Sequence, residues 1–160
     1  MSVVKSERSS SPFQVLETSI KLRTELYNFG ERRFGYKFKE RKWETEEQKE
    51  NRRMYEERFI AKEQETILTL TCKLGLAIAM FNSIYAVIDE EWTERRIWQD
   101  RAIGVCADIT QELQYIIVSV HGNLEKFIPF QEIIKQEINL IRGVRKYDNK
   151  IKNKKSKGNF

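Results

Sequence analysis

The sequence predicts an all-α protein, and three observations lead to that prediction. Of its 160 residues, 33% are charged and 40% are hydrophobic, yet only seven are glycine and two are proline. Folds rich in β-structure need more turn residues and fewer charges, so this composition is typical of helices. Apolar residues also recur at the three-and-four spacing of amphipathic helices. A chain of this length buries one good-sized core, so one domain is expected.

The first helix is expected over residues 12–34. Residues 1–11 are interpreted as a flexible N-terminal arm. Ser11 and Pro12 then supply an N-cap and a proline at the first helical position. The apolar pattern that follows runs out at Phe34 and Gly35, which predicts the end of the helix there.

A charged insert follows at about residues 36–58. It is dense in charges of both signs and has few apolar residues, so we interpret it as a connection that becomes helical toward its end. The start of the second helix stays open between Thr45 and Glu56, because nothing there blocks a helix. From Phe59 onward, one apolar stripe predicts a core-facing helix that ends near Tyr85.

The third helix is expected to begin at Asp89 or Thr93, either of which can act as its cap. Its apolar stripe runs from Trp98 to Val120. The helix is predicted to end at Gly122 and Asn123, where a left-handed C-cap is easily formed.

The fourth helix is expected to start near Leu124 or Pro129 and to fade at Gly143. Short links between the last three helices imply antiparallel neighbours. An antiparallel four-helix bundle over residues 12–143 follows.

Residues 144–160 are interpreted as a basic, flexible tail. From Arg142 to the end of the chain, eight basic residues accompany one acidic residue, Asp148. The local charge is 8 − 1 = +7, so the rest of the chain sums to 5 − 7 = −2. Such a tail attracts polyanions through counterion release, or it serves only to keep the chain soluble.

A further set of apolar positions lies away from the core stripes of the second and third helices. A single bundle needs one apolar stripe per helix. These positions therefore either widen the core or bury against another subunit, and we favour a homo-oligomer. They are Leu68, Cys72, Leu76, Ala79, Met80, Ile103, Ala107, Ile117 and Val118.

The residues give no indication of catalysis, a metal or a cofactor. The single histidine, His121, has no glutamate three residues before it, which excludes the Glu-x-x-His pairs of a di-iron bundle. A second histidine for a relay and a glycine-rich phosphate loop are both missing from the sequence. We therefore expect a protein that binds rather than an enzyme.

The sequence also bears on the compartment. The run from Leu68 to Ile88 is apolar, but Lys73 and several other polar residues interrupt it at roughly the length that a membrane span needs. A buried helix and no membrane partner are therefore expected. Cys72 and Cys106 fit no CxxC or Cys/His pattern, and the N-terminus has no continuous apolar stretch. A reduced, cytoplasmic setting is expected.

Two groups of cations are candidates for binding. The first interleaves cations with aromatic rings, a composition suited to phosphate contacts plus base stacking. The alternative is that Phe34, Tyr36 and Phe38 seat the end of the first helix on the core. The cations of this group are Arg32, Arg33, Lys37 and Lys39.

The second group is Arg95, Arg96 and Arg101. Arg96 and Asp100 stand four residues apart on the face opposite the core stripe, so a solvated salt bridge is expected between them. Arg95 projects closer to the stripe. There it snorkels, pairs with an acid on a neighbouring helix, or binds an anion.

Several segments of the chain carry a family resemblance. They are Met1–Arg8, Phe34–Gly35, Asn82–Tyr85, Glu94–Gly104, Gln111–Ile117 and Glu137–Lys150. Together they resemble small four-helix proteins of bacterial mobile elements and phages, in particular the accessory variability determinant (Avd) family of diversity-generating retroelements. The resemblance spans most of the chain but misses the charged insert.

The resemblance implies a homopentameric barrel of four-helix bundles. Such an assembly binds the reverse transcriptase of the element and its template RNA, and supports mutagenic cDNA synthesis. Members of the family are usually basic over the body, whereas here the excess positive charge lies in the tail. The resemblance makes the following residues candidate contacts to nucleic acid or polymerase: Arg95, Arg96, Arg101, Arg142, Arg145 and Lys146.

A second interpretation is a phage or mobile-element adaptor that binds only protein partners. The two interpretations differ in the expected effect of salt. Contact with several phosphates weakens RNA binding steeply as salt rises, and a flat response favours the adaptor.

Overall fold

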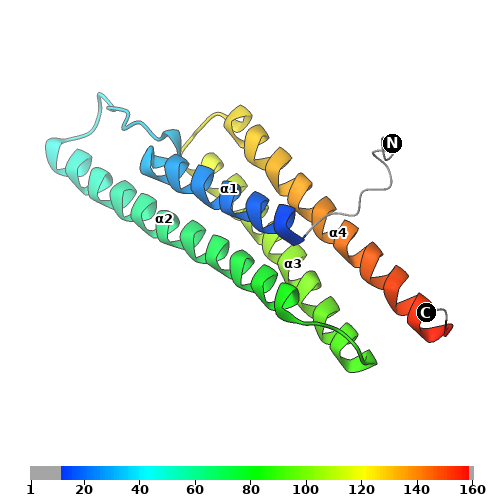
Figure 1. Cartoon of the computed structure of the whole chain (residues 1–160). Coiled ribbons are helices and arrows are strands. Elements are labelled where there is room, and N and C mark those ends of the chain that lie inside the picture. Colours follow the sequence, from blue (N-terminus) through cyan, green and yellow to red (C-terminus); the bar gives the residue numbers. More distant parts are fainter. Residues whose placement is uncertain (1–11, 159–160) are drawn as a thin grey trace.

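The computed structural model describes residues 12–158, and every regular element in that part of the chain is helical. The prediction of an all-α protein is therefore confirmed, while the arm predicted at residues 1–11 lies outside the described residues. A short 3-10 turn follows α1, and another precedes α4. The main elements (Figure 1) are α1 (Pro12–Glu31), α2 (Glu46–Ser83), α3 (Asp89–Ser119) and α4 (Ile128–Ser156).

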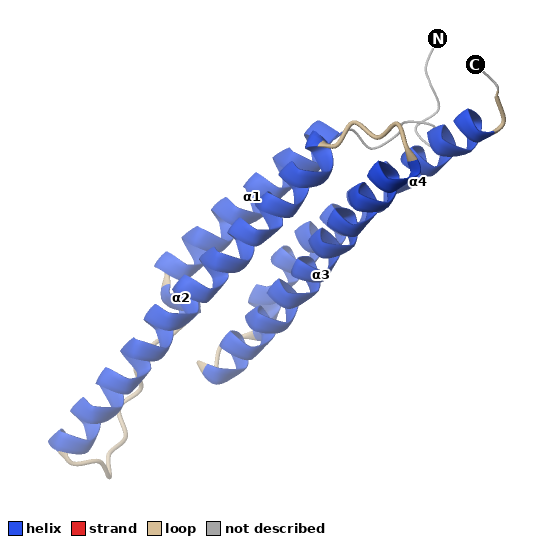
Figure 2. Ribbon diagram, turned by 90° about the horizontal axis from the view of Figure 1, so that it is seen from below, coloured by secondary structure: helices blue, strands red, loops and turns tan. Residues whose placement is uncertain are grey.

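The helices pair in two layers. Figure 2 shows α1 beside α2 and α3 beside α4. Contacts between α2 and α3 and between α1 and α4 join the two layers around one core. The largest fully buried side chains come from every helix, and they include Leu26, Ile78, Leu113 and Ile141.

The chain leaves α1 through a tight turn, the 3-10 segment Arg33–Gly35. Arg33, Phe34 and Gly35 have φ values of 59°, 54° and 75°, in the left-handed region that non-glycine residues seldom adopt. The Phe34 ring is fully buried and meets Phe29 edge-on, with 5.5 Å between ring centroids. Packing of this ring in the core holds the unusual backbone in place.

The helix α2 begins at Glu46, much earlier than the apolar stripe alone indicates. A capping box starts it: the Thr45 hydroxyl accepts a hydrogen bond from the Gln48 amide at 3.2 Å, and the Gln48 side chain accepts one from the Thr45 amide at 3.0 Å. Glu46 and Glu47 add negative charge at the positive end of the helix dipole. The connection predicted over residues 36–58 is therefore irregular only over residues 36–45.

The helix α4 continues to Ser156, so the prediction that it fades at Gly143 is wrong. Val144 and Asp148 extend the buried face by two more turns, and both are buried. A glycine inside a helix costs about 1 kcal/mol, which this packing offsets. Residues 144–156, predicted to be a flexible tail, form an ordered basic helix instead.

The additional apolar positions of α2 and α3 divide between two environments. Ile117 is buried and widens the core, and Ile103 packs partly against it. Leu76 on α2 and Val118 on α3 are instead 58% and 62% exposed. The wider core is therefore present, while burial of the exposed positions against another subunit stays a prediction.

Candidate nucleic-acid interface

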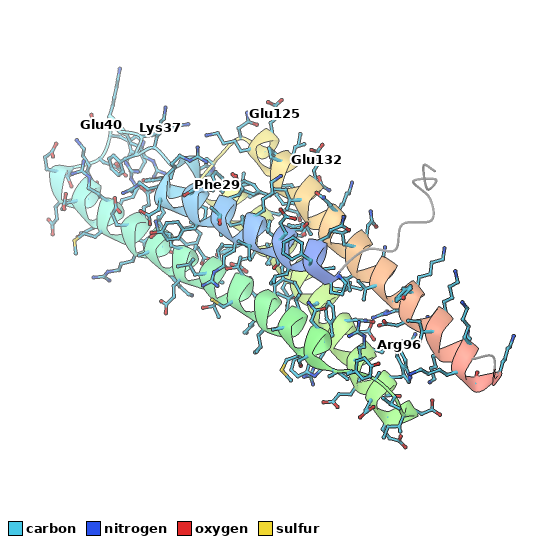
Figure 3. All side chains as sticks on the ribbon, in the orientation of Figure 1. Phe29, Lys37, Glu40, Arg96, Glu125 and Glu132 are labelled. Carbon is cyan, nitrogen blue, oxygen red and sulfur yellow. The ribbon has the colours of Figure 1, made fainter. Side chains whose placement is uncertain are left out.

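The basic residues singled out in the sequence do not form one site. Figure 3 shows Lys37 near one end of the molecule and Arg96 toward the other. Arg32, Arg33, Lys37 and Lys39 belong to the turn and connection that follow α1. The remaining six lie on the helices α3 and α4: Arg95, Arg96, Arg101, Arg142, Arg145 and Lys146.

Arg95 is an internal structural residue. Its Nε lies 2.6 Å from Asp148 Oδ2 and its Nη2 lies 3.2 Å from Asp148 Oδ1, so α3 and α4 are joined by a bidentate ion pair. Its Nη1 donates to the carbonyls of Phe81 and Ile84 at the end of α2. Of the three roles open to Arg95, the structure shows pairing with an acid on a neighbouring helix.

The same network engages Arg145. Its Nη2 lies 2.5 Å from Asp100 Oδ1, and its Nε lies 3.2 Å from Gln99 Oε1. Gln99 in turn donates to Asp148 at 2.8 Å. The expected pair between Arg96 and Asp100 is therefore replaced by a pair between helices, since Arg145 is the partner of Asp100.

Arg96 and Arg101 keep their guanidinium groups at the surface. Arg96 is exposed and forms no ion pair with the described residues. The Arg101 guanidinium lies 4.3 Å from the centroid of the Trp98 ring, a cation–π contact. A shallow hollow of about 90 Å³ between α3 and α4 gathers Arg96 with Arg145 and Lys152.

The outer face of α4 carries a row of cations that form no ion pair with the described residues. Arg142, Lys146 and Lys150 are exposed, with four residues from each to the next, so they project from successive helical turns. After Glu137, which is buried, the chain has one acidic residue, Asp148, and it is buried against Arg95. The outer face of the second half of α4 therefore carries cations among neutral residues such as Tyr147 and Asn149, and it has no exposed acid.

This face begins at Lys135, one turn before the uncharged Asn139. Lys154 and Lys157 continue it toward the end of the helix. These three lysines were not among the site residues predicted from the sequence, because they lie outside the segment Glu137–Lys150 that carries the family resemblance. The signal that identifies them is cations at helical spacing from Lys135 onward.

The cations after α1 have a different environment. Arg33 Nη2 lies 2.5 Å from Glu57 Oε1, and this guanidinium lowers the pKa of Glu57. The guanidinium groups of Arg52 and Arg53 both contact the Phe38 ring, at 4.2 Å and 4.8 Å from its centroid. Phe34 is buried in the core and Tyr36 packs partly against it, in agreement with the seating role, whereas Phe38 contacts the two arginines instead. The exposed cations of this group are Arg32, Lys37 and Lys39.

Comparisons of the chain with protein-family models, with curated proteins and with solved structures found no match.

Proposed function

We propose that this chain is a non-catalytic accessory protein of a diversity-generating retroelement. It binds the reverse transcriptase of the element and its template RNA in the cytoplasm, without a cofactor, and supports mutagenic cDNA synthesis. The observation that carries the proposal is the row of exposed cations, with no exposed acid among them, on the outer face of the second half of α4.

This face suits a polyanion for two reasons. From Arg142 to Lys157 it extends over roughly 22 Å, at 1.5 Å per helical residue, which is long enough to meet several phosphates. Its order also favours binding, because a helix that is already formed does not lose conformational entropy when it meets the RNA. Arg96 extends the surface toward α3 across the shallow hollow, whereas Lys152 in the same hollow is paired with Asp89 at 3.1 Å.

A homo-oligomer is part of the proposal. The subunit is an antiparallel four-helix bundle, and five copies form a barrel. Its support is an apolar outer surface shared by α1 and α2, which we call the α1–α2 apolar face. Exposed members include Phe13, Leu16, Ile20, Tyr27, Cys72 and Leu76.

The composition of α2 agrees with burial of this face in an assembly. One 18-residue window of α2 has a mean hydropathy of 1.4, yet only 33% of it is buried within the chain. By length and composition the helix would also suit a membrane. Leu74 and Ile78 on the same helix already pack in the protein core, so contact of the other side with a second copy is the better explanation.

A second candidate is an adaptor of a phage or mobile element that binds only protein partners. The α1–α2 apolar face also favours this candidate, because exposed apolar patches mark protein contacts. On that interpretation, the cations of α4 serve solubility alone.

Salt dependence of RNA binding separates the two candidates. Fluorescence anisotropy with a labelled single-stranded RNA is measured over a range of KCl concentrations. For the accessory protein, the logarithm of the affinity falls linearly with the logarithm of salt, by about 0.7 per phosphate contacted. A flat response, or no binding, favours the adaptor.

A charge variant locates the interface. Arg142→Gln, Lys146→Gln and Lys150→Gln together should reduce the salt slope by about two and weaken binding more than tenfold. The matched control is Lys21→Gln, Lys62→Gln and Lys73→Gln, three exposed lysines on α1 and α2. Equal losses in both variants would show that net charge alone, and not the face of α4, governs binding.

A further inference from the structure

A hollow lined with aromatic residues lies at the other end of the molecule, between the N-terminal part of α2 and the end of α3. Its volume is about 430 Å³, within the range of roughly 300 to 1,000 Å³ that small-molecule sites occupy. We propose that this hollow receives an unstacked nucleobase of single-stranded nucleic acid. The inference rests on the proposed function and adds to it the way in which a base is held.

Five rings line the hollow. They are Tyr36 after α1, Tyr55 and Phe59 on α2, Tyr115 on α3, and the imidazole of His121 just after α3. Tyr55 is 73% exposed and Tyr115 is 54% exposed. Phe59 meets Tyr115 edge-on, with 5.9 Å between centroids. Exposed rings of this kind are the surfaces on which bases stack, whatever their sequence.

The polar part of the wall is balanced in charge. Arg52 donates to Glu56 at 3.3 Å and to both carboxylate oxygens of Glu44 at 2.8 Å. The Tyr36 hydroxyl also donates to Glu56. A phosphate group would meet the Glu56 carboxylate, and an ammonium group would meet the Arg52 guanidinium. A neutral planar ring with donors and acceptors on its edge avoids both repulsions.

The rim supplies cations for the neighbouring phosphates. Lys37 and Lys39 flank the wall in the connection after Tyr36, and both are exposed. Lys126 lies over Gly35, at the foot of the same connection. Backbone contacts at the rim and ring contacts inside are the combination by which single strands are bound. Among the interleaved cations and rings of residues 32–39, the proposal thus assigns Tyr36 to binding the base. Phe34 and Phe38 remain structural.

The test uses the full-length protein and a short single-stranded RNA that carries one 2-aminopurine, a base whose fluorescence is quenched by stacking. The variant is Tyr55→Ala with Tyr115→Ala, and the matched control is Tyr85→Ala, an exposed tyrosine near the opposite end. We expect quenching with the wild type and the control. The variant should lose the quenching and bind roughly tenfold more weakly, with an unchanged salt slope.

The possible results are distinguishable. Equal quenching with the wild type and the double variant overturns the inference, and so does an equal loss with Tyr85→Ala. If the α4 charge variant weakens binding and the tyrosine variant does not, the proposed function stands and the inference fails. If the tyrosine variant weakens binding and the α4 charge variant does not, the inference of a base in the hollow stands and the proposed interface on α4 is wrong. No binding by the wild type at low salt overturns both. Circular dichroism of each variant verifies that the helices are intact.

Discussion

Arg95 on α3 and Asp148 on α4 form a bidentate ion pair whose side chains are each only 12% exposed. Two further groups complete it: Gln99 donates to Asp148, and Arg95 donates to the Phe81 carbonyl at the end of α2. The pair therefore connects three helices at the level where α4 was expected to have ended already. It explains why the helix remains ordered beyond Gly143.

Arg95→Gln is predicted to destabilise the protein by about 3 kcal/mol, because it leaves the Asp148 carboxylate buried without its cation. Asp148→Asn should cost a similar amount, and the double variant should cost less than the two losses added. Chemical denaturation followed by circular dichroism measures the three values. Arg96→Gln on the same helix is the control and should stay within about 0.5 kcal/mol of the wild type.

Much of the fold was predictable because the core stripes are strongly periodic. Ile109 and Leu113 on α3, for example, stand at the expected spacing and are fully buried. The end of α4 was not predictable in the same way, because Gly143 resembles a helix end. The decisive contribution comes from Val144 and Asp148, whose burial depends on contacts with distant parts of the chain.

The candidate site was less predictable than the fold. The partner of Arg95 is 53 residues away, so the sequence offered three roles for this arginine and could not choose among them. Arg96 and Asp100 have the spacing of a salt bridge, yet Arg145 takes the acid from the neighbouring helix. The spacing of charges along the sequence predicts ion pairs within one helix. It does not reveal a residue of another helix that binds the same acid.

Glu137 gives the protein a predicted dependence of stability on pH. Its side chain is fully buried on α4, and neither carboxylate oxygen has a hydrogen-bond partner among the described residues. Burial raises the pKa of Glu137 to about 8 from an ordinary value of 4.5. Between these two values the folded state holds a proton that the unfolded chain has released. Stability should therefore fall as pH rises from about 4.5 to about 8 and change little from this group above that.

Glu137→Gln should flatten this dependence, because the carboxamide stays neutral. As the pH rises from about 5 to about 8.5, the free energy of unfolding of the variant should increase relative to that of the wild type by an amount on the order of 3 kcal/mol. Burial, with a smaller effect from the Glu137 charge, raises the pKa of Cys106 to about 12, so its thiol stays protonated in this window. Buried Glu63, next to Glu112, also has a raised pKa, about 7, but its contribution cancels in the comparison.

Urea denaturation across the pH series measures this difference. Glu132→Gln, an exposed change on the same helix (Figure 3), serves as the control and should leave the slope unaltered. If the free energy of unfolding falls with pH as steeply in Glu137→Gln as in the wild type, the assignment of the proton to Glu137 is contradicted.

Thr45→Ala is predicted to loosen the start of α2. The change removes the hydroxyl that caps the helix and should cost about 1 kcal/mol. Because this part of α2 extends beyond the end of α1 (Figure 1), the loss should be largely local. Hydrogen exchange should quicken over residues 46–56 and remain slow in the core of the helix. Thr45→Ser should restore protection, whereas Thr69→Ala at an exposed position should have little effect.

The α1–α2 apolar face is predicted to hold copies of the chain together. Tyr27 and Leu68 line one shallow groove between α1 and α2, so the exposed apolar residues of the two helices are neighbours at this point. Ile20→Lys with Leu76→Lys places two charges at side chains that are 56% and 58% exposed. Neither change should disturb the core, but each puts an ammonium group where the assembly would bury it.

Light scattering after size-exclusion chromatography should show this double variant as a single 19.1 kDa particle and the wild type as a larger assembly. Leu124→Lys, a similarly exposed apolar position in the 3-10 turn before α4, should assemble like the wild type. Cys72 provides a second measurement on the face itself, since it is a free, exposed thiol. Mild oxidation should join the Cys72 thiols of two wild-type copies in a disulfide only if the copies contact each other at this face. A wild type that is monomeric at every concentration would refute the assembly and leave the face open to a different protein partner.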